Sequence, residues 1–212
     1  IINTPDTLNI TGNGEITVES RGPGNAGTIK ITSPNMALFE SIDITASTSD
    51  IGDGGQIKIE AGEITAPNST ISAKSTGAGN AGTIDITAQG DITTGVVTSA
   101  AKNDIETAHG GSISITSQQG KINATEAIQS FSEGGNAGDV TLKAKADITA
   151  NTISSHGKQK GGQITIISEA GNIDASSGEF LANYSGGGDA GDITLEAPQG
   201  NITTNNIYSY AD

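Results

Sequence analysis

The chain contains no cysteine and no tryptophan, and it has only 3 tyrosines and 3 phenylalanines among its 212 residues. Without cysteine there is no disulfide framework, no thiolate metal site and no cysteine nucleophile. Large aromatic side chains normally supply much of the area that a domain core buries. Because they are so scarce here, any core must be thin and built from aliphatic side chains.

Basic residues are also scarce: 10 lysines and arginines face 24 acidic residues, which gives a net charge of −14. Nucleic-acid binding requires clustered lysine and arginine to neutralise phosphates, so it is not expected. No run of about 18 apolar residues occurs, so membrane insertion is not expected either. The opening residues begin in the middle of a repeat, which is typical of a mature or excised segment.

Residues that carry out catalysis are few. The two histidines, His109 and His156, fall in non-adjacent repeats, and the only arginine is Arg21. No Ser-His-Asp arrangement, two-histidine metal motif or phosphate-binding loop of the Walker type is present. The glycine-rich turn 134–139 has one residue too many for a calcium-binding nonapeptide repeat, although occasional surface calcium stays open. We predict no enzymatic activity, no cofactor and no dedicated metal site.

What the chain does have is a recurring sequence motif of ten residues, which we call the phrase. The segment 24–33, Gly-Asn-Ala-Gly-Thr-Ile-Lys-Ile-Thr-Ser, returns almost verbatim at 79–88, and looser copies surround five further glycines. The closing glycines of the seven copies follow one another at intervals of 24 to 29 residues: Gly27, Gly55, Gly82, Gly111, Gly138, Gly162 and Gly191. A period in this range indicates a stacked-repeat architecture in which each unit touches only its neighbours.

Each repeat contains three apolar positions separated by turns. The first is a strand that alternates apolar and polar residues, such as Thr28–Thr32, and a small residue follows it at a tight corner. The first apolar column is expected at Ile29, Ile57, Ile84, Ile113, Val140, Ile164 and Ile193. Stacked rungs of this kind pair backbone to backbone at roughly 4.8 Å and enclose a continuous isoleucine core. We therefore predict an all-β fold, a right-handed parallel β-helix (β-solenoid) of about seven rungs of about 27 residues, with three short strands per rung. Residues 1–212 are expected to form a single β-solenoid segment, an excerpt of a longer repeat array.

The glycine-rich turns are expected to use glycine for positive φ and for close stacking. The second residue of these turns is polar in five repeats, at Asn25, Asp53, Asn80, Asn136 and Asp189. Two alternatives are open: these side chains form a ladder along the rod, or they make ordinary hydrogen bonds within each turn.

One outward column is rich in rings. Three residues after the third apolar position of successive repeats lie Lys74, Ala100, Phe131, His156, Tyr184 and Tyr210. We name Phe131, His156, Tyr184 and Tyr210 the aromatic strip. An apolar edge on an otherwise polar rod suits packing against another rod or binding of a sugar. The alternative is a stabilising ladder beneath a turn.

The segment 79–87, followed by Gly90-Asp91-Ile92-Thr93-Thr94, resembles the repeats of filamentous haemagglutinin-like exoproteins, which are exported by two-partner secretion. The form Gly-Asn-Ala-Gly-x-Ile-x-Ile is similar in particular to long cyanobacterial surface proteins assigned to that family. The resemblance covers the chain from about Leu8 to Tyr210. It implies a right-handed β-helix, an extracellular or bacterial cell-surface location, and a role in adhesion, aggregation or competition between bacteria. The family's secretion domain and any toxin domain are not in this segment.

Two functional classes follow. The first is a non-catalytic structural shaft of a secreted or cell-surface filamentous adhesin or fibre, acting in surface coating, adhesion or aggregation. Its partners would be copies of itself, end to end or side by side, and surface glycans. The second is a carbohydrate-binding or carbohydrate-active parallel β-helix. A groove lined by clustered acids with a basic partner would favour the second, and uniform polar faces would favour the first.

Overall fold

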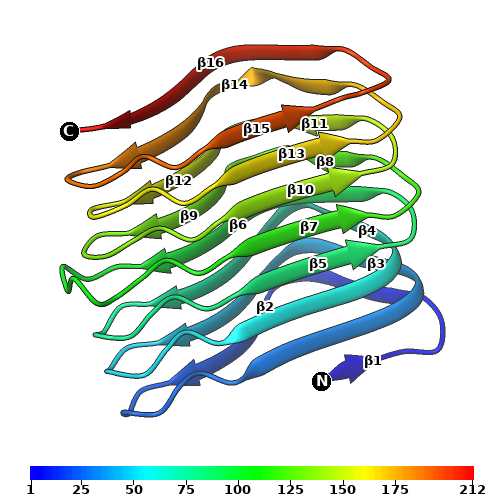
Figure 1. Ribbon diagram of the computed structural model, residues 1–212. Helices are drawn as coiled ribbons and strands as arrows, with labels where there is room; N and C mark the ends of the chain where they lie inside the picture. The colour runs from blue at the N-terminus through cyan, green and yellow to red at the C-terminus, as the bar shows by residue number, and fades with distance from the viewer.

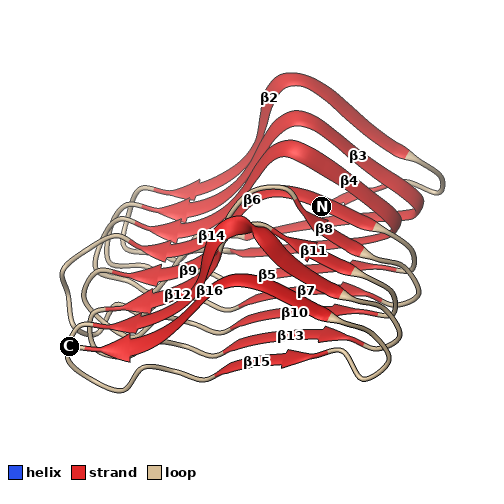
Figure 2. Cartoon of the chain, turned by 90° about the horizontal axis from the view of Figure 1, so that it is seen from above, coloured by secondary structure: helices blue, strands red, loops and turns tan.

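The computed structural model describes the backbone of residues 1–212 and the side chains of all of them except residues 179–185. It is an all-β structure in which the strands join into one parallel sheet that winds around a narrow core (Figure 1). The chain runs along the near face, returns along the far face and rises with each circuit, which makes the coil right-handed (Figures 1 and 2). The predicted fold class, a right-handed parallel β-helix of about seven turns, is confirmed.

We number the rungs 1 to 8 along the chain. Their strands, in order, are β1 (Ile2–Asn3) and β2 (Leu8–Ser20) in rung 1; β3 (Thr28–Thr48) in rung 2; β4 (Gln56–Ser75) in rung 3; β5 (Ile84–Ala88) and β6 (Ile92–Ala101) in rung 4; β7 (Ile113–Ser117), β8 (Ile122–Ala124) and β9 (Ile128–Ser132) in rung 5; β10 (Val140–Ala144), β11 (Ile148–Ala150) and β12 (Ile153–Gly157) in rung 6; β13 (Ile164–Ser168) and β14 (Ile173–Ser185) in rung 7; and β15 (Ile193–Glu196) and β16 (Ile202–Ala211) in rung 8. Every pairing between these strands is parallel and joins equivalent positions of neighbouring rungs.

Each rung has a first, a second and a third segment, in chain order, and these are three separate strands only in rungs 5 and 6. In rungs 2 and 3 they merge into the single long strands β3 and β4, which bend around the corners without leaving the ladder. The corner between the second and third segments is wider in these rungs, and Figure 2 shows it projecting beyond the rest of the coil. Phe39 lies on β3 between these two segments and is fully buried. The sequence pattern did not place this residue in the core.

The first apolar column is continuous. Backbone register aligns its seven members one above another, from Ile29 opposite Ile57 to Ile164 opposite Ile193. Six of them are buried, with at most 4% of the surface exposed, and Ile193 is half-buried. Ile and Val side chains suit this position because β-branched residues pack well on a pleated surface. The predicted column is confirmed.

Glycine is required at the closing positions because the turns of neighbouring rungs stack closely on one another. A Cβ atom on Gly82 would overlap the carbonyl oxygen of Gly55, and one on Gly111 would overlap the carbonyl oxygen of Gly82. The expectation of close stacking is confirmed, but the expectation of positive φ is wrong. Across the described backbone, only Gly12 and Ser41 have positive φ. Glycine is needed here because a neighbouring backbone occupies the space of a side chain.

A column of interior serines connects the third segment of rungs 4 to 6 to these turns. The hydroxyl group of Ser99 donates to the carbonyl oxygen of Gly82 at 2.6 Å and accepts the N–H of Gly111 at 3.0 Å. Ser130 and Ser155 repeat the arrangement one and two rungs further on. All three serines are completely buried. Their hydroxyl groups satisfy backbone groups that would otherwise be left without partners inside the corner.

Candidate functional site

The aromatic strip lies in register on the outward side of the third segment. Backbone pairing places His156 opposite Phe131 on one side and opposite Tyr184 on the other, and Tyr184 opposite Tyr210. Lys74 and Ala100 occupy the same column in rungs 3 and 4. The side chain of Tyr184 lies outside the described residues, so ring contacts are described for the other members only.

Phe131 and His156 form the contact at the centre of the strip. Their ring centroids are 5.3 Å apart and the ring planes meet at 66°, which is an edge-to-face arrangement. Both side chains are half-buried. Burial lowers the pKa of His156 below its ordinary value, because partial removal from water disfavours the charged ring. Since the two rings are tilted against each other, they pack on one another and do not form a flat platform for a sugar ring.

The strip becomes exposed at rung 8. Tyr210 has half of its surface exposed (50%), and Tyr208 on the same strand has 46%. Ile207 is the third apolar position of rung 8, pairs with Leu181 and is 47% exposed. Tyr208 and Tyr210 lie on the outward side of the strand and form what we call the apolar area on β16, which is where the strip could contact another molecule.

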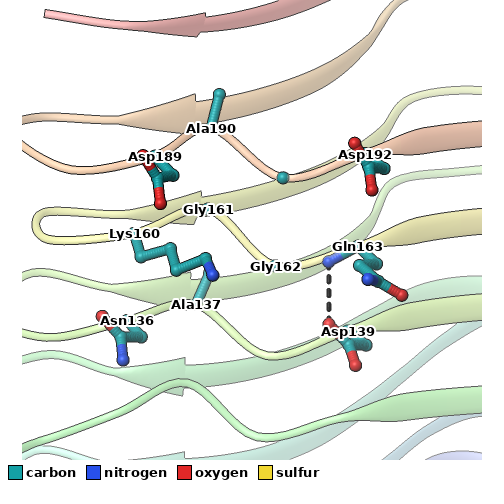
Figure 3. Close-up of a pocket in the computed structure, with 11 residues that line it drawn as sticks. Asn136, Ala137, Asp139, Lys160, Gly161, Gly162, Gln163, Asp189, Ala190 and Asp192 are labelled. Atoms are coloured by element: carbon teal, nitrogen blue, oxygen red, sulfur yellow. Dashed lines mark hydrogen bonds between the residues drawn. The ribbon is translucent and has the colours of Figure 1, made fainter.

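A polar hollow lies at the turn that leads from the third segment back to the first. It has a volume of about 450 Å³ and crosses rungs 5 to 8 (Figure 3). It is lined by polar and small residues: Asn136, Ala137, Asp139, Lys160, Gly161, Gly162, Gln163, Asp189, Ala190, Gly191 and Asp192. No single repeat predicts this hollow, because its side chains come from three successive turns. The only signal in the sequence is the polar residue before each first strand.

The hollow has two sides. On one side, Asp139, Gln163 and Asp192 precede the aligned strands β10, β13 and β15, and the carboxylate of Asp139 accepts the backbone N–H of Gln163 at 2.7 Å. On the other side, Lys160 lies between Asn136 and Asp189 (Figure 3). Three carboxylates and one ammonium group therefore surround a space that is open to solvent, and they could bind the hydroxyl groups of a sugar. Among the residues whose side chains are described, no group of three or more His, Asp or Glu side chains is placed to hold a metal ion.

The second residues of the glycine-rich turns form a ladder, which decides between the two alternatives left open by the sequence. In three of the five turns the side chain accepts a hydrogen bond from the backbone N–H of its counterpart one rung further on. The carbonyl oxygen of Asn25 accepts from Asp53 at 2.8 Å, the carboxylate of Asp53 from Asn80 at 2.8 Å, and the carbonyl oxygen of Asn80 from His109 at 2.8 Å. His109 was not predicted to belong to the ladder, yet its Nδ1 accepts from the N–H of Asn136 at 3.0 Å.

The same device recurs at the corner before the second segment. The carboxylate of Asp147 accepts the N–H of Asn172 at 2.7 Å, and the side-chain oxygen of Asn172 accepts the N–H of Asn201 at 2.9 Å. Asx side chains readily accept hydrogen bonds from nearby backbone groups. Here the backbone group belongs to the next rung, so the side chains connect rungs as well as shaping turns.

Ion pairs lie on the outer face of the first segment. Glu60 contacts Lys58 at 3.0 Å and Lys30 at 3.6 Å, and Glu169 contacts Lys143 at 3.1 Å and Lys145 at 3.2 Å. Hydrogen bonds from these lysines lower the pKa of Glu60 and of Glu169. Both clusters are solvent-exposed, so they contribute little to stability.

Comparison with family models, curated proteins and solved structures finds no match to this chain. Among the described residues, no helix has the length and hydrophobicity needed to cross a membrane. The resemblance to filamentous haemagglutinin-like repeats stays a prediction, and the functional proposal below is drawn from the fold and its surfaces.

Proposed function

We propose that the chain is part of a non-catalytic structural shaft of a secreted or cell-surface filamentous adhesin or fibre. The observation that supports this proposal is the parallel ladder that continues through every rung from β1 to β16, with register shifts only between the segments of a rung. Backbone pairing joins each rung only to its neighbours, so further rungs can be added to the stack in the same way. A molecule built in this way gains length in direct proportion to its sequence.

The interactions between rungs favour stiffness. Backbone hydrogen bonds in a β-helix run along the axis, and the buried apolar column and the polar turn ladder run parallel to them. With a rise of roughly 4.8 Å per rung, about seven turns extend roughly 34 Å. Bending the shaft would break all three sets of contacts at once. Such a shaft would hold a surface layer or an adhesive tip away from the cell.

We place the shaft outside the cell or on a bacterial cell surface, in line with the resemblance of its repeats. Its partners would be copies of itself, end to end or side by side, and surface glycans. The net charge of −14 opposes close lateral packing of like rods, so side-by-side contact would be confined to apolar areas such as the one on β16.

Electron microscopy of the purified chain, together with protease accessibility on intact producing cells, tests this proposal. We expect rods of uniform width that exceed the length of one chain, and cleavage of the protein by protease added outside the cells. Globular particles, or protection of the protein from external protease, would contradict it. Turnover of acidic polysaccharides by the chain would also overturn the non-catalytic role.

A second candidate is supported by the polar hollow. It combines clustered acids with a lysine, as expected of a carbohydrate-binding or carbohydrate-active β-helix, although no aromatic residue lines it. Glycan-array binding by the wild-type chain and by a Lys160→Ala/Asp192→Asn variant would test it. Binding that the variant loses supports a sugar site in the hollow. Equal signals from the two proteins would exclude the hollow as the site.

A further inference from the structure

Both histidines of the chain contact the same segment, from opposite sides. The segment 128–138 comprises the third strand of rung 5, β9, and the turn that follows it. His109, in the turn before rung 5, accepts the backbone N–H of Asn136 from one side. His156, on β12 of rung 6, packs against the ring of Phe131 from the other side. The segment 128–138 therefore lies between the two histidine rings, one in the turn before rung 5 and the other on rung 6. We call this arrangement the clasp.

The contact made by His109 depends on its protonation state. Nδ1 must lack a proton in order to accept from Asn136, so the neutral ring carries its proton on Nε2. When the ring becomes an imidazolium, both nitrogen atoms are donors, and an N–H on Nδ1 would face the N–H of Asn136. The same position in the preceding turns is occupied by Asn25, Asp53 and Asn80, whose side-chain oxygen atoms accept the corresponding hydrogen bonds. An asparagine oxygen keeps this acceptor role whatever the pH, because the amide does not titrate.

His156 responds in the same direction. Burial lowers its pKa in the folded chain, so the unfolded chain binds the proton more readily. The stabilising contribution of the neutral His156 ring is therefore fully present above the unfolded pKa of about 6.5, and it is lost as the pH falls from there through the lower pKa of the folded chain.

Ionisable groups of both signs lie on the elements around the two rings. The loop that carries His109 also carries Asp104 and Glu106, and Lys158 pairs with Asp104. The turn of rung 5 carries Glu133, and Lys160 lies opposite Asn136 in the next turn. On β14, the position opposite His156 is Tyr184, whose side chain lies outside the described residues. Because acids and lysines are mixed, the direction of the response is set by the hydrogen-bond geometry of His109 and the burial of His156.

We propose that His109 and His156 form a proton-sensitive clasp on the segment 128–138, which loosens in mild acid while the rungs on either side stay paired. The inference goes beyond the shaft proposal and does not depend on it. It assigns one joint of the β-helix, between rungs 4 and 6, as the place where the stack first opens when the surroundings become acidic.

The chain itself suggests the test variants. His109→Asn restores the residue found at this position in the neighbouring rungs and keeps an acceptor for Asn136. His156→Phe keeps a ring next to Phe131 without a titrating group. Hydrogen exchange of the wild-type chain and of the double variant is measured at pH 7.5 and 5.5, with correction for the intrinsic exchange rate. Ordinary Asp and Glu side chains titrate near pH 4, so they stay charged at both values.

In the wild-type chain we expect peptides covering 128–138 to lose at least about tenfold protection at pH 5.5 relative to pH 7.5. Peptides from β4 and β5 should not change, and the double variant should retain its protection at both pH values. The proposal is overturned if the wild-type chain shows no local loss, or if the double variant loses as much. A nitrogen-15 NMR titration of the wild-type histidine rings checks the cause independently of any variant. Ring protonation that does not coincide with the loss of protection would also overturn it.

Discussion

The hydroxyl group of Ser155 donates a hydrogen bond to the carbonyl oxygen of Gly138, 2.9 Å away, in the turn of the preceding rung. The hydroxyl oxygen of Ser155 also accepts the backbone N–H of Gly162 at 2.9 Å, in the turn that follows its own rung. One buried hydroxyl group therefore connects two turns that are 24 residues apart. Stability of the rod rests on such contacts between rungs as well as on the apolar core.

We expect Ser155→Ala to lower the free energy of unfolding by about 1–3 kcal/mol, because it leaves buried backbone groups without partners. Ser154→Ala is the matched control, since it makes the same change one residue earlier on β12, where the side chain is only half-buried. Urea denaturation followed by circular dichroism measures both. Equal losses would show that the hydroxyl group of Ser155 does not stabilise the turns.

Gly82→Ala should be strongly destabilising, by about 3 kcal/mol or more, because its Cβ would overlap the backbone of Gly55. Gly27→Ala changes the same position of the nearly identical phrase in the turn after rung 1, where a Cβ would meet only Val18 at an ordinary 3.9 Å. We expect that variant to stay within about 0.5 kcal/mol of the wild-type chain. Thermal melting of both proteins makes the comparison. If they melt together, close stacking is not the reason for glycine.

Ile115→Asn should cost at least about 3 kcal/mol, since it removes a fully buried side chain and places an unpaired amide in the core. Asp85→Asn should change stability by less than about 0.5 kcal/mol, because this side chain lies on the outward side of β5 and is only half-buried. The melting temperatures of the two variants decide whether the inward and outward faces are assigned correctly. Similar shifts would contradict the assignment.

The apolar area on β16 is expected to mediate side-by-side contact between rods. Tyr208→Ser/Tyr210→Ser removes two rings that are about half exposed, so it should weaken self-association and leave the fold intact. Sedimentation velocity at several protein concentrations measures the association, and far-ultraviolet circular dichroism monitors the fold. If the variant unfolds while its association is unchanged, the exposed end of the strip is a structural ladder and binds no neighbour.

Much of the fold could be predicted because each repeat carries its pattern in consecutive residues. Alternation from Thr28 to Thr32 specifies one buried face, and the return of the same phrase at intervals of 24 to 29 residues specifies the stacking. Register then follows, because a slip of one residue would turn Ile57 or Ile84 out of the core. The alignment of the aromatic strip was predictable for the same reason.

The tertiary structure alone decided what happens between rungs. The acceptor role of His109, the clasp on the segment 128–138, the Ser155 bridge and the polar hollow each join atoms from different rungs. No local pattern reports on them, because they depend on how closely two turns approach and on which atoms then meet. The sequence by itself determined that the chain coils and which face of each strand is buried. The close spacing of neighbouring turns decided that glycine is needed there to avoid a clash with the next backbone, and not to adopt positive φ. It also decided that a histidine takes the place of an asparagine in the turn ladder.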